Sequence, residues 1–422
     1  MADRPIVIVG AGLAGLCTAW FLSAAGRQVR VIERREDVAM ETSHANGGML
    51  TPSASEPWNA PGVQWLLLKW LGREDAPMLL RVGALGHYLS WGIRFLANAR
   101  PDRFRAATEA NFRLSSYSLN ETRTLRQQLG LVYGAGTRGT IKLFRNAVAL
   151  EASLARSEHL KSLGLMHSAL DRAGVVRAEP LLAEIEHRIA GGIRYPGDET
   201  GDAHLFCREL ARRLTEKGVT FDFGTRIKRL LVEQGRIKGV VTSTGTVEAD
   251  AIVVAAAAWS AGLVNSLGVR LAVRPVKGYS LSIPVASSIR MLELGVIDDE
   301  MHAVATPLDG SLRLAGTAEF CGWDSRPHPG RTQMLWDFLG ALSPTLAQCV
   351  DRSRARPWCG FRPMSADGCP YIGRTGVDGL YINTGHGHLG WTQAVGSGKL
   401  LSQLLLRTPV DIDVMPFDAR RG

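Results

Sequence analysis

Short apolar runs alternate with a helical pattern over the first 33 residues of the chain. Residues 5–9 form a β-branched run typical of a strand buried in a parallel sheet. A glycine-rich turn follows, and then a helical stretch over 16–25 that Gly26 ends as a C-cap residue would. Residues 28–32 predict a second strand, which Glu33 closes. This order predicts the first strand–turn–helix–strand unit of a nucleotide-binding α/β fold.

The remaining hydrophobic pattern predicts a mixed succession of elements. Helices are expected at residues 57–110, 111–130, 203–217, 337–350 and 393–406. Strands are expected at residues 219–223, 229–232, 239–243, 250–259, 276–283, 313–316 and 379–384. Turns are expected to dominate residues 191–202 and 360–373, with strands and turns together at 132–144. Asp202 is expected to cap the helix that follows it, and the chain is predicted to return to the nucleotide domain near residues 200 and 355.

Length and composition bound the class of protein. With 422 residues, 45% of them hydrophobic, the chain is long enough for two or three domains. Its six cysteines include no CxxC pair, which argues against a disulfide framework or a zinc site, and we expect no bound metal. We expect neither a signal peptide nor a membrane-spanning helix, because we find no basic start with an apolar stretch and no run of about 20 apolar residues. A cytoplasmic location is therefore expected.

The net charge of +9, from 49 basic and 40 acidic residues, admits acidic partners. No nucleic-acid-binding motif accompanies it, so we expect no nucleic-acid partner. One segment, residues 57–110, combines basic residues with many Trp and Leu. Such helices could lie peripherally on the inner face of the cell membrane. We favour the alternative that their apolar faces are packed inside a second domain, because apolar stripes are more often core.

The turn after the first strand reads Gly10-Ala11-Gly12-Leu13-Ala14-Gly15. Gly10 permits the tight turn, Gly12 lets the backbone approach a pyrophosphate, and Gly15 lets the helix pack closely on the strand. The helix N-terminus offers free N–H groups and the positive end of its dipole to phosphates. Glu33, 21 residues beyond Gly12, is placed to accept hydrogen bonds from ribose hydroxyls. This combination predicts a bound dinucleotide.

The segment after the second strand indicates whether the bound dinucleotide is FAD or NAD. It is rich in small and hydroxylated residues, which suit a loop that continues along the pyrophosphate toward a flavin. Cofactor contacts are expected from Arg34, Arg35, Thr42, Ser43, Asn46, Gly47, Gly48, Met49 and Leu50. An NAD-dependent dehydrogenase, which needs no such loop, is the less favoured alternative. FAD is therefore the predicted cofactor.

Two later segments are predicted to meet the same cofactor. The buried strand at 250–259 runs into small residues, which lets the backbone at Ala256, Ala257 and Trp259 approach the cofactor. A second strand–glycine loop–helix unit offers another helix N-terminus to negative charge on a reduced flavin. Contacts from this unit are expected from Gly385, His386, Gly387, His388, Leu389, Gly390, Trp391 and Thr392. Its two histidines could be bases or metal ligands, but without acidic or Cys partners nearby we favour loop residues beside the cofactor.

Arg362 is an isolated cation in the expected loop before the last buried strand. A carboxylate substrate would need such a guanidinium as a bidentate partner. A structural ion pair is the alternative, and the residues alone do not favour either interpretation.

Six motifs in chain order resemble those of the D-amino-acid oxidase superfamily of FAD enzymes, and within it the bacterial quinone-linked D-amino-acid dehydrogenases. They lie at residues 10–15, 41–48, 57–63, 196–202, 275–280 and 383–391, so the likeness covers nearly the whole chain. The resemblance implies an α/β fold with a discontinuous, Rossmann-like FAD-binding domain and a substrate domain of mixed β-sheet and helices. The FAD-binding domain is expected at residues 1–56, 195–272 and 355–422, and the substrate domain at residues 57–194 and 273–354.

The resemblance also implies roles for single residues. Arg362 matches the arginine that binds the substrate carboxylate, Tyr279 is a candidate pocket residue, and Ile227 stands where a backbone contact to adenine is usual. His388 occupies a position where relatives carry Thr or Arg, and an Arg there would contact the substrate carboxylate. Arg362, Tyr279 and His388 are the predicted catalytic residues. Cys359 lies one position from the flavin attachment site of sarcosine-oxidase relatives, so non-covalent FAD is expected.

The implied activity is oxidative deamination of a D-amino acid to the 2-oxo acid and ammonia. Hydride would pass from Cα to flavin N5, and electrons would go on to a quinone or another respiratory acceptor. Departures from the family pattern at His44, Ala257 and His388 argue for a retuned pocket and against assuming D-alanine as the preferred substrate. The alternatives are an oxidase or dehydrogenase of hydroxyproline, proline, glycine or an N-substituted amino acid and, from another class, a non-catalytic dinucleotide-binding subunit.

Overall fold

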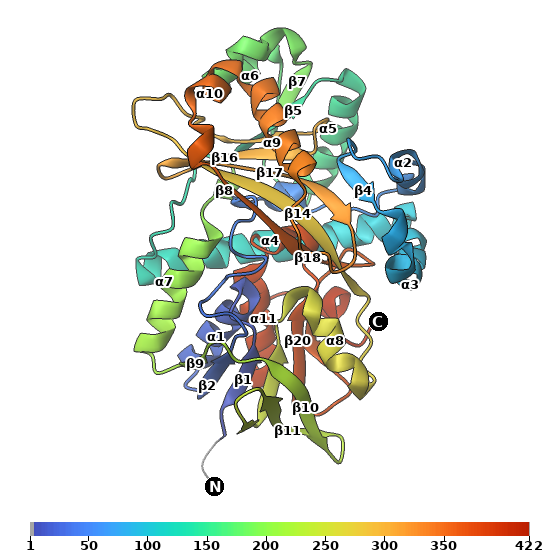
Figure 1. Ribbon diagram of the computed structural model, residues 1–422, viewed down its shortest axis with the longest axis vertical. Coiled ribbons are helices and arrows are strands. Elements are labelled where there is room, and N and C mark those ends of the chain that lie inside the picture. The colour runs from blue at the N-terminus through green and yellow to red at the C-terminus, as the bar shows by residue number, and fades with distance from the viewer. Residues whose placement is uncertain (1–3, 422) are drawn as a thin grey trace.

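A six-stranded sheet in the lower half of Figure 1 contains the first strand of the chain. The computed structural model describes residues 4–421, so our expectations for residues 1–3 and 422 lie outside the described residues. The strands run in the order β19 (Tyr371–Arg374), β20 (Leu380–Thr384), β13 (Ala251–Val254), β1 (Ile6–Val9), β2 (Val29–Ile32) and β9 (Thr220–Asp222). Neighbouring strands are parallel except β19 and β20. Three separate stretches of chain build this sheet, which confirms the predicted α/β fold with a discontinuous Rossmann-like unit.

Helices cover one face of this sheet and a smaller sheet covers the other. Ile6 and Ile8 of β1 pack against α1 (Leu13–Ala24), α7 (Ala203–Glu216) and α11 (Ala394–Leu406). The alternate residues Val7 and Val9 pack against a three-stranded antiparallel sheet and a short helix. These elements are β10 (Ile227–Glu233), β11 (Arg236–Thr242), β12 (Thr246–Glu248) and α8 (Ser260–Val264). Burial on both faces explains why β1 reads as an unbroken apolar run.

A nine-stranded mixed sheet forms the upper half of the molecule (Figure 1). Its strands run in the order β18 (Arg356–Ser365), β14 (Val273–Pro284), β17 (Ser311–Phe320), β16 (Ala303–Leu308), β15 (Gly295–Asp298), β5 (Thr140–Phe144), β7 (Gly191–Tyr195) and β6 (Ser168–Leu170), and β4 (Met78–Leu80) pairs with β17. Apolar residues of this sheet share one core with α6 (Arg172–Ala178), α9 (Pro329–Leu342) and α10 (Pro344–Cys349). A smaller core joins β5 and β7 to α5 (Ala147–Lys161). The mixture of parallel and antiparallel pairs agrees with the predicted second architecture.

The two sheets are joined by long and short connecting elements. The 29-residue helix α4 (Pro101–Leu129) crosses the middle of the molecule in Figure 1. A two-stranded sheet pairs β3 (Met49–Leu50) with β8 (Glu199–Thr200). Two further helices, α2 (Val63–Trp70) and α3 (Leu85–Ala97), lie at the side of the molecule with β4. The 3₁₀ turns are η1 (Pro52–Ala54), η2 (Val82–Ala84), η3 (Pro180–Arg188), η4 (Ala257–Trp259), η5 (Asn265–Leu267), η6 (Arg352–Arg354), η7 (Gly387–Leu389) and η8 (Met415–Phe417).

Three expected segments have a different secondary structure. Residues 360–365 and 371–373, expected within one turn-rich loop, belong to β18 and β19. Strand β18 pairs with β14 from Val273↔Ser365 to Ser282↔Arg356. The glycine that suggested a turn, Gly360, instead makes room for the ring of Trp358, which a Cβ at position 360 would overlap. Residues 191–195, expected as turns, form β7. Residues 78–80, expected as helix, form β4 because they pair with β17.

Helices α2 and α3 also depart from expectation, because only part of their apolar surface is packed. Tyr88, Trp91 and Phe95 of α3 are buried. The opposite side of the helix leaves Leu89 68% exposed and Ile93 64% exposed. On α2, Trp65 is 69% exposed. Across residues 4–421 no helix is both long and apolar enough to cross a membrane.

Candidate active site

The turn between β1 and α1 has the close contacts that its glycines predict. Gly10 has φ 108°, and a Cβ there would lie 2.7 Å from the Ala255 carbonyl oxygen. A Cβ on Gly15 would overlap the Gly10 carbonyl, so this glycine serves helix–strand packing. Glu33 accepts hydrogen bonds from the N–H groups of Ala11 at 2.8 Å and Arg35 at 2.9 Å. The carboxylate is thereby held at the end of β2, beside the glycine turn.

A first cavity of about 250 Å³ lies along this turn. It brings together predicted residues from four parts of the chain, namely Gly10, Gly12, Glu33, Arg34, Thr42, Ser43, Ile227, Ala256, Ala257 and Trp259. The Arg34 guanidinium carbon lies 3.7 Å from the centroid of the Trp259 ring, and its Nη2 lies 2.5 Å from Glu41 Oε1. This cation–π contact and ion pair close one side of the cavity.

A second, larger cavity of about 590 Å³ continues from the first. Gly12, Thr42, Ser43, Ala255 and Ala257 line both, so the two cavities form one trough. Predicted cofactor and catalytic residues in the second cavity are Leu13, Ala14, Asn46, Gly47, Met49, Tyr279, Arg362, His386, Gly387, His388, Gly390 and Trp391. The trough thus runs from Ile227, past the N-terminus of α1, to Arg362.

The trough has the features that FAD requires. It is long, it passes the N-terminal N–H groups of α1, and it ends in a wider chamber. The buried Nε2 atom of His386, which lines the chamber, has no hydrogen-bond partner among residues 4–421. A buried nitrogen of this kind is expected where a bound group supplies the missing partner. The residues present therefore fit a dinucleotide whose far end lies in the second cavity.

Some predicted cofactor residues line neither cavity. They are Gly15, Arg35, Gly48, Leu50, Gly385, Leu389 and Thr392. Their contacts in the structure are with protein groups: Arg35 pairs with Glu41 at 2.6 Å, and Thr392 Oγ1 accepts from the Thr51 N–H at 3.0 Å. Leu50 and Leu389 are buried in the core. Motif membership alone could not separate these supporting residues from the lining ones.

The loop after β2 is held by bonds that reach both sheets. Ser43 Oγ accepts from the Leu13 N–H at 3.3 Å, and Thr42 Oγ1 donates to the Phe361 carbonyl at 2.7 Å. Thr306 Oγ1 donates to the Gly47 carbonyl at 2.6 Å. The loop is therefore fixed between α1 and the nine-stranded sheet, where the two cavities join.

Arg362 lies on β18 and not in a loop, with its half-buried guanidinium facing the second cavity. The guanidinium occupies space that is open because residue 278 on the paired strand is glycine. A Cβ at position 278 would overlap the guanidinium. Nη1 donates to the Thr317 carbonyl at 3.2 Å, and the guanidinium carbon lies 5.6 Å from the Trp58 ring centroid. Within the described chain it pairs with no carboxylate, and burial lowers its pKa to about 10, so it stays charged at neutral pH. This argues against the structural ion pair and leaves the cation free for an anionic ligand.

Thr317, which holds Arg362, has an unusual backbone. Its φ is 56°, a left-handed value that is rare for a β-branched residue. The β14–β17 pairing shifts register at this point, between Lys277 and Tyr279. Its buried Oγ1 has no hydrogen-bond partner in residues 4–421. Strain and an unpaired hydroxyl at a residue that contacts the candidate substrate-binding arginine indicate a functional constraint.

Tyr279 is anchored beneath the cavity by a buried polar cluster. Its hydroxyl donates to Glu319 Oε2 at 2.5 Å, and Lys277 Nζ lies 3.1 Å from the same oxygen. Burial and the bond to Glu319 raise the pKa of Tyr279. Its hydroxyl is therefore committed to Glu319, which makes the residue a poor proton donor to a substrate.

His388 lines the second cavity together with Arg362, and both lie against Trp58. Its ring stacks on Trp58 with a centroid distance of 5.6 Å and an interplanar angle of 20°. Nε2 lies 3.0 Å from the Ala54 carbonyl oxygen, which can only accept, so Nε2 carries the proton and Nδ1 has a free lone pair. Burial, assisted by the Arg362 charge, lowers the pKa of His388 to about 4, and burial lowers that of His386 to about 4. Both rings are neutral at physiological pH.

The sequence did not point to the outer wall of the second cavity. This wall includes two ion pairs, Arg156–Glu56 at 2.6 Å and Lys142–Asp299 at 2.7 Å. It also contains apolar side chains from α2 and β4. Their residues are ordinary in type and come from distant segments, so only the fold brings them together.

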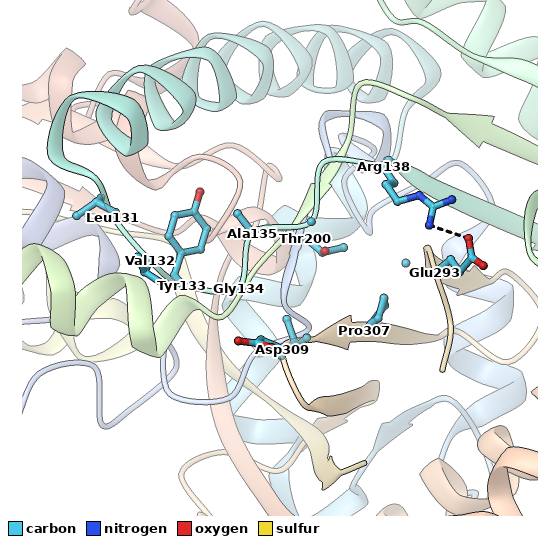
Figure 2. A pocket seen from close by; sticks show the side chains of 14 residues that line it. Leu131, Val132, Tyr133, Gly134, Ala135, Arg138, Thr200, Glu293, Pro307 and Asp309 are labelled. Carbon is cyan, nitrogen blue, oxygen red and sulfur yellow. Dashed lines mark ion pairs between the residues drawn. The ribbon is translucent and has the colours of Figure 1, made fainter. Parts of the chain in front are cut away.

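A separate groove of about 490 Å³ borders β8 and is shown in Figure 2. It is lined by the loop after α4, by Thr200 and by β16 residues, and it includes none of the predicted site residues. Two of its three charged groups, Arg138 and Glu293, pair with each other at 2.6 Å, and the third is Asp309 (Figure 2). Because the cation that lines this groove, Arg138, is already paired and the groove contains none of the predicted cofactor residues, we infer that the active site lies in the trough.

Comparison with known proteins identifies the family of the chain. A family model described as "FAD dependent oxidoreductase" matches residues 5–404. The chain is 40% identical over 410 residues to the D-amino acid dehydrogenase of Paramagnetospirillum magneticum, which covers 97% of this chain and 96% of that protein. It is 40% identical over 408 residues to the D-amino acid dehydrogenase of Allorhizobium ampelinum, with 97% and 96% coverage.

Solved structures show the same fold at low identity. The glycine oxidase of Geobacillus kaustophilus superposes with a TM-score of 0.76 at 23% identity and covers all of both chains. The L-proline dehydrogenase of P. horikoshii superposes with a TM-score of 0.79 at 18% identity, covering 99% of this chain and 97% of that one. The chain therefore belongs to the FAD-dependent oxidoreductase family, and FAD is its cofactor.

Proposed function

We propose that the protein oxidises a D-amino acid to the 2-oxo acid and ammonia. The observation that carries this proposal is Arg362, a cation without a carboxylate partner in the described chain, facing the wide end of the trough. The relatives at 40% identity, which bear the name D-amino acid dehydrogenase, support the same substrate class. FAD, when bound, supplies the acceptor for the hydride that leaves Cα.

The residues of this chain would hold the substrate by its two polar ends. Arg362 would take the carboxylate in a bidentate contact. His388, neutral with a free Nδ1, would accept a hydrogen bond from the amino group. Positioning by these two contacts, together with exclusion of water from the chamber, would supply most of the catalytic effect. The imino acid then takes up water and releases ammonia.

We also propose that FAD is bound without a covalent link. Cys359 lines neither cavity, and its Sγ donates to the Ser325 carbonyl at 3.4 Å. The division into an FAD-binding domain at residues 1–56, 195–272 and 355–422 and a substrate domain at 57–194 and 273–354 is likewise our proposal. It is supported by the separate cores of the two large sheets, although residues 1–3 and 422 are not described.

As electron acceptor we propose a quinone or another respiratory carrier, with peripheral contact of the protein to the membrane. The exposed apolar side chains of α2 and α3 support this contact. A quinone takes up two electrons and two protons, the number that leaves the amino acid. An oxidase that uses oxygen is the alternative.

A related amine is the second candidate substrate, because the fold is shared with a glycine oxidase and an L-proline dehydrogenase. The test is product formation with a water-soluble dye as acceptor and D-amino acids, L-amino acids, glycine, proline and hydroxyproline as substrates. We expect the 2-oxo acid and ammonia in equal amounts from D-amino acids, and loss of turnover in R362A with FAD retained. Turnover with only glycine or a cyclic amine would favour the second candidate, and a yellow protein without turnover would favour a non-catalytic subunit.

A further inference from the structure

Half of the exposed large apolar side chains in residues 4–421 lie in one short segment. Nine of eighteen occur between residues 65 and 96. They are Trp65, Leu66, Leu68, Leu71, Val82, Leu85, Leu89, Ile93 and Leu96, and we call them the α2–α3 face. Apolar residues scattered singly on a surface need no explanation, but a cluster of this kind marks an interaction site.

The α2–α3 face belongs to one structural unit. The inner sides of α2 and α3 share a core in which Val63 joins Tyr88, Trp91 and Phe95. The end of α2 is tied to β4 where the Gly72 N–H donates to the Leu80 carbonyl at 3.2 Å. On α3, the exposed residues 85, 89, 93 and 96 are spaced by four, four and three positions, so they lie on one side of the helix. Within residues 4–421, this unit is packed on one side, and its apolar outer side has no cover.

The charges around the α2–α3 face are mostly positive. Residues 63–105 contain seven Lys and Arg against three Asp and Glu. The acids Glu74, Asp75 and Asp102 each pair with an arginine of the same segment. Lys69 on α2 and Arg94 on α3 are exposed and form no ion pair with any carboxylate that the structure describes. An apolar face with free cations complements an anionic lipid surface and would repel a second copy of itself.

Helix α2 also forms part of the wall of the second cavity. Val63, Leu66 and Trp70 line it, together with Met78 of β4. Leu66 is 44% exposed and so belongs to both the cavity wall and the α2–α3 face. A lipophilic molecule leaving a membrane at this face would meet apolar side chains up to the chamber that holds Arg362.

We propose that the α2–α3 face docks on an anionic membrane surface and that a membrane-borne quinone reaches the second cavity past α2. The acceptor part of this inference rests on the proposed function, whereas the docking part does not. Reduction of the quinone to the quinol takes up the two electrons and two protons released by the amino acid, so no further reactant is needed. Membrane docking would give a role to the exposed sides of α2 and α3, which we had expected from the sequence to be packed in the core.

The experiment compares holoenzyme binding to vesicles of phosphatidylglycerol mixed with phosphatidylcholine and to vesicles of phosphatidylcholine alone. We expect binding to the anionic vesicles that weakens with added salt. The double variant L89E/I93E should bind anionic vesicles at least roughly tenfold more weakly than the unaltered protein, because it removes apolar contact and adds negative charge. Both side chains are more than 60% exposed, so the substitutions leave the core intact. V148E, at a side chain 74% exposed on α5, is the matched control and should bind like the unaltered protein.

Rates with a soluble dye and with a quinone distinguish a loss of membrane docking from a loss of substrate oxidation. With a water-soluble dye, L89E/I93E should oxidise substrate as fast as the unaltered protein, while its rate with decylubiquinone in anionic vesicles should fall several-fold. Equal vesicle binding by L89E/I93E and V148E, or no binding at all, would overturn the proposal. A dimer that L89E/I93E converts to a monomer, without vesicle binding, would make the face a subunit interface and overturn it as well. Absence of dye reduction in every protein would instead contradict the proposed function, with docking still decided by the vesicles.

Discussion

The guanidinium of Arg362 donates from Nη1 to the main-chain carbonyl of Thr317 at 3.2 Å, and Thr317 itself has a φ of 56°. The left-handed residue sits at the register shift between β14 and β17. Its carbonyl therefore leaves the regular ladder and can accept from the arginine of β18. A cation without a carboxylate partner among residues 4–421 is in this way held beside the second cavity by a single backbone group.

We predict that R362M lowers kcat/KM by roughly 1000-fold, or about 4 kcal/mol, because two charge-assisted hydrogen bonds contribute roughly 1.5–3 kcal/mol each. R362K, which keeps the charge but not the planar fork, should lose less. The measurement is steady-state kinetics with the flavin spectrum recorded for each variant. The thermal midpoint of R362M should not fall, because removing a half-buried cation that has no carboxylate partner among residues 4–421 does not destabilise the fold. Unchanged kcat/KM in R362M would contradict the carboxylate contact.

Two variants at position 317 separate the carbonyl from the side chain. T317V keeps the shape and removes the unpaired hydroxyl, so we expect the free energy of unfolding to rise by about 1 kcal/mol and KM to stay the same. T317G relieves the left-handed strain but frees the carbonyl, so KM should rise about fivefold, the loss of roughly one hydrogen bond. Urea unfolding and steady-state kinetics measure the two effects. If both variants kept the original KM, Thr317 would not position Arg362.

His388 is predicted to act as a neutral hydrogen-bond acceptor. H388F, which keeps the stack on Trp58, should lower kcat/KM by about tenfold, the loss of roughly one hydrogen bond. Because burial lowers the pKa of His388 to about 4, the pH profiles of the unaltered protein and H388F should run parallel between about pH 6 and 8. An acidic limb near neutrality that disappears in H388F would show that His388 works as a base of higher pKa.

Asp198 should make stability depend on pH. It is buried, it accepts from Ser53 Oγ at 2.6 Å and Thr140 Oγ1 at 2.7 Å, and burial raises its pKa to about 6 from an ordinary 3.8. A folded-state pKa above the unfolded value gives stability that is present at low pH and lost as the pH rises through about 6. The loss in the free energy of unfolding amounts to about 3 kcal/mol, the free-energy equivalent of the difference between the folded and unfolded pKa.

The matched variant for this effect is D198N, which cannot titrate. The free energy of unfolding of D198N relative to the unaltered protein should increase between pH 4 and 8, as followed by urea midpoints at each pH. A difference that stays constant with pH would show that Asp198 keeps an ordinary pKa.

The features that could be predicted from the sequence are those set by local motifs. The turn at Gly10 to Gly15, the strand that ends at Glu33 and the cap at Asp202 are set by residues close together in the chain. Asp202 indeed accepts from the N–H groups of His204 and Leu205 at the start of α7. Such features follow from backbone geometry within a few residues.

Features that depend on distant partners could not be predicted in this way. Gly360 suggested a turn, yet β18 is a strand because it pairs with β14, about 80 residues earlier along the chain. Thr317 gives no sign in the sequence of a left-handed backbone, since its type favours strands. The hydrophobic pattern of α3 is consistent with either face being packed, and only the fold shows that Leu89 and Ile93 stay exposed.

The oxidation of D-amino acids at Arg362 is tested most directly by the visible spectrum of the purified protein under anaerobic conditions, before and after addition of D- and L-amino acids in turn. We expect D-amino acids to bleach the flavin band, their L-enantiomers not to bleach it, and R362M to stay yellow with both. Bleaching by L-amino acids alone would contradict the assigned substrate class, and bleaching of R362M at the same substrate concentration would contradict the site.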